Sequence, residues 1–155
     1  DISTQRLVEL ASKLGSDCAF FIENNSVLAS EKGEVLSPIK FKLDCYCIVV
    51  NPKIHVSTQV AYSQVIPKKP IIKLSDAIKN SKNKWQNMIQ NDFELSVFKE
   101  FQTIRELKES LLSQGAFYAS MSGSGSSVFG FFNEPPTDLM LNKNYQVKSF
   151  KLNID

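Results

Sequence analysis

Residues 117–132 read FYASMSGSGSSVFGFF, in which two apolar runs flank the hexapeptide SGSGSS at residues 122–127. The apolar and β-prone residues on each side predict two buried strands, and the hexapeptide predicts the turn that joins them. Its two glycines allow positive φ angles and the close approach of a ligand to the backbone. The hydroxyls and backbone N–H groups around them suit phosphate oxygens. Taken alone, this stretch is interpreted equally well as a plain hairpin connection.

The composition indicates a globular chain whose partner is a small molecule. A length of 155 residues suffices for one domain with a substantial core. Hydrophobic residues make up 43% and charged residues 22% of the chain, which excludes disorder, and no apolar run approaches the ~18 residues that span a bilayer. The formal charge is only +2, with lysines scattered singly apart from the pair Lys68-Lys69, so no basic face indicates nucleic acid.

The order of predicted elements indicates an α+β fold, in which helices pack on one face of an antiparallel sheet. We expect residues 1–155 to form a single domain. The predicted elements are a helix that Ser3 or Thr4 caps and that ends at Gly15, an apolar strand over 18–22 within a meander of short strands over 18–43, a central strand over 46–51, helices over 74–80 and 84–90, an amphipathic helix that ends at Gly115, the hairpin, a short helix over 138–142 and a final strand over 145–152.

Asp17 is a carboxylate at the mouth of the expected strand over 18–22. Such a carboxylate is more often a turn or cap residue than a catalyst. Farther along, residues 53–62 carry the hydroxyl of Thr58 and the ring of Tyr62. The residues themselves favour a short helix with Tyr62 packed inward.

The polar run Asn91-Asp92-Phe93-Glu94 separates two helical patterns. Asn91 or Asp92 can cap the helix that follows, and Glu94 falls near its first turn, where a negative charge is favourable.

The cysteines and the single histidine predict no metal site. Cys18, Cys45 and Cys47 form no Cys-x-x-Cys pair, and the last two would share one face of a strand. We interpret them as reduced thiols that serve as small apolar side chains in a cytoplasmic protein. His55 has no supporting cluster for a metal site or a catalytic triad, so we expect it to be structural or surface-exposed.

Three stretches together resemble the GHMP kinase superfamily: LGSDCAFF at 14–21, VSTQVAY at 56–62, and NDFE at 91–94 followed by MSGSGSSVFG at 121–130. The resemblance implies the fold of the family's C-terminal domain. It also implies that the N-terminal lobe, with a lysine and a glycine-rich loop for the ATP phosphates, is absent from this chain. The chain opens with Asp1 instead of methionine, as expected for a fragment or a processed product. By itself it is expected to be inactive.

Within the superfamily, the resemblance is to kinases that use ATP and Mg²⁺ to phosphorylate the 2-hydroxyl of 4-diphosphocytidyl-2-C-methyl-D-erythritol, in non-mevalonate isoprenoid precursor biosynthesis. It implies that Asp17 is catalytic and accepts or orients the hydroxyl proton. Tyr62 would stack on the cytosine, and Thr58 would lie in the same substrate site. The residues implied to hold phosphate oxygens are Ser122, Gly123, Ser124, Gly125 and Ser126.

Two other functions fit the sequence. Another GHMP kinase would act on mevalonate, homoserine or a sugar, acceptors that carry no base and need no aromatic at Tyr62. A non-catalytic α+β module would bind an anion at residues 122–127 and transfer nothing.

Overall fold

The chain divides into two compact units, residues 1–41 and 42–155, and each is described by itself. The computed structural model describes residues 2–15, 17–31, 33, 35–63, 65 and 69–154. The expectation of a single domain over the whole chain stays a prediction. Of the helices in these described ranges, none has both the length and the apolar character of a membrane span.

The first unit begins with helix α1 (Thr4–Leu14), which confirms the amphipathic pattern. The Ser3 hydroxyl accepts a hydrogen bond from the Arg6 N–H at 3.3 Å, so Ser3 is the N-cap. Helix α2 (Phe20–Glu23) follows, and then strands β1 (Val27–Ser30) and β2 (Val35–Pro38) pair antiparallel. The hairpin of β1 and β2 confirms the antiparallel pairing expected in the second half of the meander.

The apolar strand expected over 18–22 is wrong, because this segment is a turn that leads into α2. The Cys18 N–H donates to the Gly15 carbonyl at 3.1 Å, and the Phe21 N–H donates to the Cys18 carbonyl at 3.3 Å. An apolar run this short has no period that separates a strand from one helical turn.

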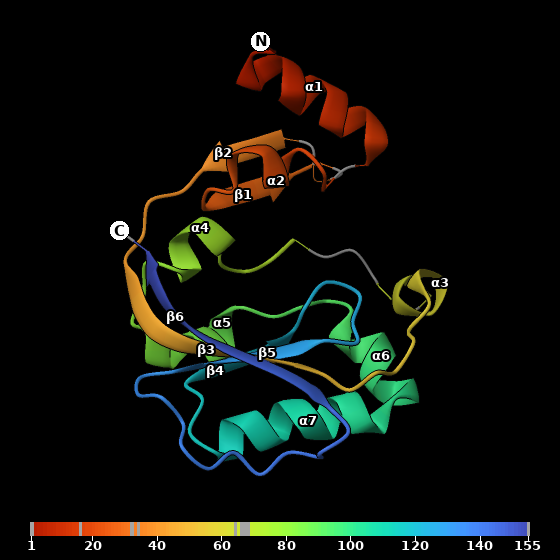
Figure 1. Ribbon diagram of the computed structural model, residues 1–155, viewed down its shortest axis with the longest axis vertical. Coiled ribbons are helices and arrows are strands. Elements are labelled where there is room, and N and C mark those ends of the chain that lie inside the picture. The colour runs from red at the N-terminus through yellow and green to blue at the C-terminus, as the bar shows by residue number, and fades with distance from the viewer. Residues whose placement is uncertain are drawn as a thin grey trace. The chain divides into compact units, whose positions relative to one another are not determined.

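The second unit is built on a four-stranded antiparallel sheet in the order β4-β5-β3-β6 (Figure 1). Strand β3 spans Leu43–Asn51, β4 spans Tyr118–Met121, β5 spans Val128–Phe132, and β6 spans Gln146–Ile154. In the register, Ile48 of β3 lies opposite Gly130 of β5 and Ser149 of β6. The central strand, the hairpin and the final strand expected from the sequence are therefore confirmed.

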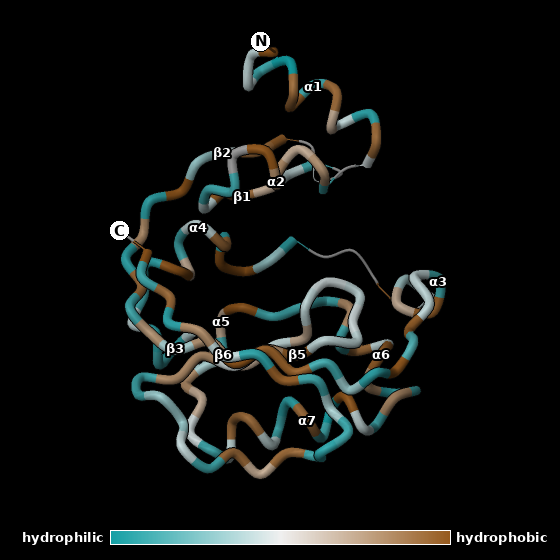
Figure 2. The backbone as a smooth tube through the Cα atoms, in the orientation of Figure 1, coloured by the Kyte–Doolittle hydropathy of each residue, from teal (hydrophilic) through white to brown (hydrophobic). Residues whose placement is uncertain are grey.

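Helix α7 (Gln102–Ser113) lies along one face of the sheet, against β4 and β5. Its hydropathy alternates along the helix in Figure 2, and Ile104, Leu107 and Leu111 are its buried residues. They join Val50 and Val128 in the core. The remaining helices of this unit are α3 (Thr58–Tyr62), α4 (Leu74–Ala77), η1 (Lys82–Lys84), α5 (Trp85–Met88) and α6 (Glu94–Glu100). The α+β prediction is confirmed.

The short helix expected over 138–142 is wrong. Leu139 and Leu141 pack against the core from an irregular segment. The Gln114 side chain takes the place of helical hydrogen bonds there, because its Oε1 accepts from the Met140 N–H at 2.6 Å and its Nε2 donates to the Met140 carbonyl at 3.3 Å.

The turn at residues 122–127, called the Ser/Gly turn below, closes on itself between β4 and β5. The Ser122 N–H donates to the Ser127 carbonyl at 2.8 Å, and the Gly125 N–H donates to the Ser122 carbonyl at 3.0 Å. Gly123 has φ 53° and Gly125 has φ 94°, so both positions use the freedom of glycine.

The two glycines should differ in their tolerance of a methyl group. A Cβ at Gly125 would lie 2.8 Å from the Met121 Sδ, whereas a Cβ at Gly123 would have no neighbour within 4 Å. We expect Gly123→Ala to lower the free energy of unfolding by about 1 kcal/mol through backbone strain alone. Gly125→Ala should cost roughly 2–4 kcal/mol, because overpacking adds to the strain. Urea denaturation measures both, and equal losses would contradict the packing around Gly125.

Candidate functional site

The Ser/Gly turn presents backbone donors that the fold does not use. Within the described residues, the N–H groups of Gly123, Ser124 and Ser126 donate to no protein acceptor. A backbone N–H seldom stays unpaired unless water or a ligand satisfies it. Successive N–H groups around positive-φ glycines form a concave anion-binding surface. The turn therefore fits phosphate oxygens, as the sequence predicted, although that role stays a prediction.

Asn91 ties the Ser/Gly turn to the start of α6. Its Nδ2 donates to the carbonyls of Met121 and Gly123, both at 2.8 Å, and its Oδ1 accepts from the Phe93 N–H at 3.0 Å. Both the nitrogen and the oxygen of the Asn91 side-chain amide therefore have hydrogen-bond partners. At the other end of the turn, the Asn51 Nδ2 donates to the Ser127 hydroxyl at 3.2 Å.

Glu94 is a buried carboxylate that anchors the end of β4. Its Oε1 accepts from the Met121 N–H at 2.8 Å and from the Ser120 hydroxyl at 3.1 Å, and its Oε2 accepts from the Lys108 Nζ at 2.5 Å. The side chains of Glu94 and Lys108 are only 11% and 15% exposed. Burial of the pair is tolerable because the carboxylate gains two further donors.

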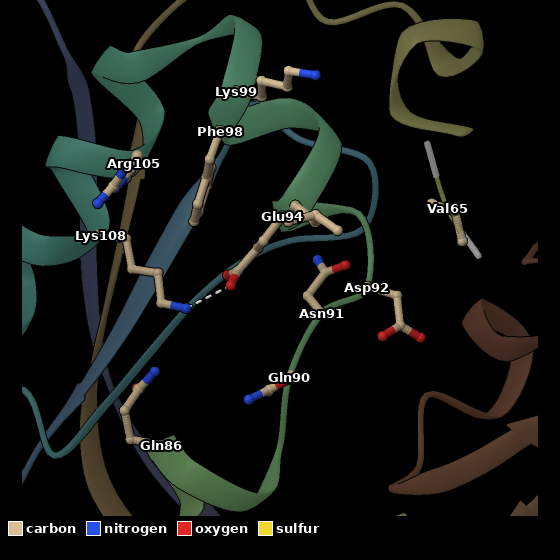
Figure 3. Close-up of a pocket in the computed structure, with 11 residues that line it drawn as sticks. Val65, Gln86, Gln90, Asn91, Asp92, Glu94, Phe98, Lys99, Arg105 and Lys108 are labelled. Atoms are coloured by element: carbon tan, nitrogen blue, oxygen red, sulfur yellow. Dashed lines mark hydrogen bonds and ion pairs between the residues drawn. The ribbon is translucent and has the colours of Figure 1, made fainter. Parts of the chain in front are cut away.

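A pocket of about 880 Å³ lies beside this ion pair, between the approach to α6 and the start of α7 (Figure 3). Lys108 points toward Glu94 across it, as the dashed line shows. Arg105 pairs with Glu109 at 2.9 Å. Two of the pocket's cations therefore already have protein partners, which weakens it as an anion site compared with the Ser/Gly turn.

The structure brings Tyr62 into the same region as the Ser/Gly turn. Tyr62 ends α3 and is 61% exposed, so the inward-packed alternative is wrong; Ala61, fully buried, takes the inward position. The Tyr62 and Phe93 rings pack in a T-shaped arrangement, with a centroid distance of 4.7 Å and an interplanar angle of 66°. The exposed part of the Tyr62 ring is apolar surface on which a base could stack.

Thr58 is the exposed first residue of α3, where Ser57 is the N-cap and its hydroxyl accepts from the Val60 N–H at 3.2 Å. The cap hydrogen bond of α3 is therefore made by Ser57 and not by Thr58. Its place in a substrate site stays a prediction.

Asp17 lies exposed in the turn between α1 and α2. This position agrees with the turn interpretation of the residue. Asp17 belongs to the first unit, so the structure brings together Tyr62 and the Ser/Gly turn but leaves the catalytic role of Asp17 a prediction.

The cysteines are apolar packing residues, as expected. Cys45 and Cys47 are buried free thiols on one face of β3. Burial raises the pKa of Cys47 to about 12 and also raises the pKa of Cys45, so both stay protonated near neutral pH. His55 is exposed. Among the described residues, no three His, Cys, Asp or Glu side chains gather to hold a metal ion.

The long-range roles of Asn91, Glu94 and Lys108 were not predicted from the sequence. One signal was present but was not used: Lys108 lies four residues after Ile104 and three before Leu111, which places a cation beside the apolar face of the helix. A cation beside a core indicates a carboxylate partner elsewhere in the chain. The sequence does not say which one.

Comparison with known proteins assigns the family. Residues 73–145 match the family model described as GHMP kinases C terminal. The chain is 45% identical over 133 residues to "4-diphosphocytidyl-2-C-methyl-D-erythritol kinase" of Bacteroides fragilis, covering 85% of this chain and 48% of that protein. It is 44% identical over 137 residues to the protein of the same name from Cytophaga hutchinsonii, covering 87% of this chain and 51% of that protein.

A crystal structure of "4-(cytidine 5'-diphospho)-2C-methyl-D-erythritol kinase" aligns with a TM-score of 0.70 and 28% identity, covering 81% of this chain and 47% of that one. This chain spans about half the length of the curated relatives it matches. The sequence, the fold and these relatives agree, and the chain belongs to the GHMP kinase family, whose C-terminal domain it carries.

Proposed function

We propose that the complete protein containing this chain transfers the γ-phosphoryl group of ATP to the 2-hydroxyl of 4-diphosphocytidyl-2-C-methyl-D-erythritol. One observation carries the proposal: the Ser/Gly turn, with three N–H groups that have no acceptor among the described residues, is connected through Asn91 and Phe93 to the exposed ring of Tyr62. An anion site near an aromatic ring suits a nucleoside diphosphate. The printed names of the relatives support the same acceptor.

Each predicted residue has a role in this reaction. Asp17 accepts or orients the proton of the attacking hydroxyl, and the Ser/Gly turn holds oxygens where the phosphates and the acceptor meet. Tyr62 stacks on the cytosine, and Thr58 lies beside it. Mg²⁺ would neutralise the charge of the phosphates. The main ATP-phosphate loop belongs to an N-terminal lobe.

We place the protein in the cytoplasm, in isoprenoid precursor biosynthesis, with neither nucleic acid nor a membrane as partner. The buried free thiols of Cys45 and Cys47 support a cytoplasmic location. The scattered lysines argue against nucleic acid as a partner. A GHMP kinase for mevalonate, homoserine or a sugar is the nearest rival. The exposed ring of Tyr62 favours the cytidyl substrate, because those acceptors carry no base.

The 155-residue chain should not act as a kinase by itself, because the family's ATP-phosphate loop lies in the other lobe. Incubation with ATP, Mg²⁺ and the cytidyl substrate should give no product above background, while the complete protein should turn over this substrate and not mevalonate or homoserine. Product formation by the isolated chain would show that the N-terminal lobe is not needed for ATP binding and catalysis. Preference of the complete protein for an acceptor without a base would contradict the proposed substrate.

Tyr62→Ala should weaken substrate binding in the complete protein. Base–aromatic stacking is worth about 1–3 kcal/mol, so the apparent KM for the cytidyl substrate should rise by roughly one to two decades. Tyr62→Phe keeps the ring and serves as the matched control, with a KM close to that of the wild type. Steady-state kinetics at saturating ATP measures both, and an unchanged KM for the alanine variant would remove Tyr62 from the substrate site.

Asp17→Asn should keep substrate binding and lower kcat, because it preserves the shape of the side chain and removes the base. A positioned general base contributes about 10²–10⁴-fold. The loose transition state of phosphoryl transfer places the loss near the lower end of that range. Asp76→Asn is the matched control, since Asp76 is an exposed carboxylate in a surface pair with Lys79. A folded Asp17→Asn enzyme with kcat within about threefold of wild type would exclude Asp17 as the base.

A further inference from the structure

The segment 91–94, called the NDFE segment here, contacts both halves of the candidate site. Asn91 donates to the Gly123 carbonyl within the Ser/Gly turn, and Phe93 packs against Tyr62. Only Asp92 separates Asn91 from Phe93 along the chain, and both residues directly precede α6. The anion-binding turn and the exposed ring are therefore fastened to one short piece of backbone.

The connection on the Tyr62 side is rigid. Ser96, 1% exposed, donates from its hydroxyl to the Ala61 carbonyl at 2.6 Å, and its geometry to the Phe93 carbonyl at 3.0 Å also fits a hydrogen bond. Ala61 immediately precedes Tyr62 and is itself fully buried. The end of α3 that carries the ring is thus held against α6 by a buried hydrogen bond and by ring contact, and only the outer part of the ring is left for a ligand.

The connection on the turn side is equally constrained. Asn91 bridges two carbonyls, one at the end of β4 and one inside the turn, with the same amide nitrogen. Glu94 accepts from the Met121 N–H on that strand end, and Lys108 of α7 neutralises the carboxylate (Figure 3). A buried, fully hydrogen-bonded network of this kind has few alternative arrangements.

We propose that the NDFE segment is a positioning element that sets the separation between the base-contacting ring of Tyr62 and the phosphate-contacting Ser/Gly turn. This proposal rests on the proposed function and deepens it, because a fixed separation selects ligands by the length of the link between base and phosphate. A nucleoside diphosphate would engage both ends at once, whereas a nucleoside would engage only the ring. Asn91 acts through the turn, and Phe93 acts through Tyr62.

The test is the ratio of affinities for cytidine diphosphate and cytidine, measured by titration calorimetry on the complete protein. Asn91→Ala should weaken cytidine diphosphate binding by about tenfold more than cytidine binding, because the lost Nδ2 bonds to the turn affect only the diphosphate, whereas the lost bond from the Phe93 N–H affects both ligands alike. Phe93→Leu should weaken both ligands together, because it loosens the ring that both use. Asn80→Ala is the matched control, since the Asn80 side chain donates only to the nearby Asp76 carbonyl on an exposed turn.

The ratio of the two affinities distinguishes a role of Asn91 in positioning the turn from a role in the stability of the whole fold. A falling ratio in Asn91→Ala, with the control unchanged, supports the proposal. Equal losses for the two ligands, or no loss for either, would overturn it. Amide hydrogen exchange supplies a readout that does not depend on ligands: the hydrogen-bonded amides of Ser122 and Gly125 should exchange at least about tenfold faster in Asn91→Ala, while β3 stays protected.

Exchange also keeps this proposal distinct from the proposed function. If the wild-type protein binds neither cytidine diphosphate nor cytidine, the cytidyl substrate is wrong, and exchange alone decides the role of Asn91. Faster exchange confined to the amides of Ser122 and Gly125 would then support positioning of the turn, and unchanged exchange would overturn it.

Discussion

The buried carboxylate of Glu94 is the interaction on which the arrangement of the second unit depends. It begins α6, accepts from the end of β4, and takes its counter-charge from Lys108 of α7. One side chain therefore links the sheet with α6 and α7. Removing one partner of a buried pair typically costs about 3–5 kcal/mol, since the other charge is left without compensation. The site can be precise because the elements that carry it share this anchor.

The candidate site follows from this anchor by short steps. Once β4 and α6 are fixed, Asn91 meets the carbonyls of Met121 and Gly123, and the turn beyond them is held at its start. Asn51 of β3 holds the turn near its end through Ser127. The N–H groups of Gly123, Ser124 and Ser126 have no acceptor among the described residues, and they lie where the chain is restrained on both sides. Donors fixed before a ligand arrives stabilise charge without a reorganisation cost.

The sequence predicted the parts of this protein that depend on periodicity. The strands around the Ser/Gly turn and helix α7 were found because apolar spacing alone decides them. The segment over 18–22 was assigned wrongly because its apolar run is too short to show a period. Residues 138–142 were assigned wrongly because Gln114, far away in sequence, supplies the hydrogen bonds of Met140. For the site, the residue types of the Ser/Gly turn and Tyr62 were visible. The contacts of Asn91 and Glu94 with β4 and the turn span 26 to 32 residues, and local patterns carry no information on them.

The central claim is that the Ser/Gly turn and Tyr62 form one binding site for a nucleoside diphosphate. Its most direct measurement is the set of amide chemical shifts in the complete protein during titration with cytidine diphosphate. The account predicts saturable shifts at Gly123, Ser124 and Ser126 that follow the same binding curve as the ring signals of Tyr62. Shifts confined to the pocket around Arg105, with the turn and Tyr62 unaffected, would contradict it.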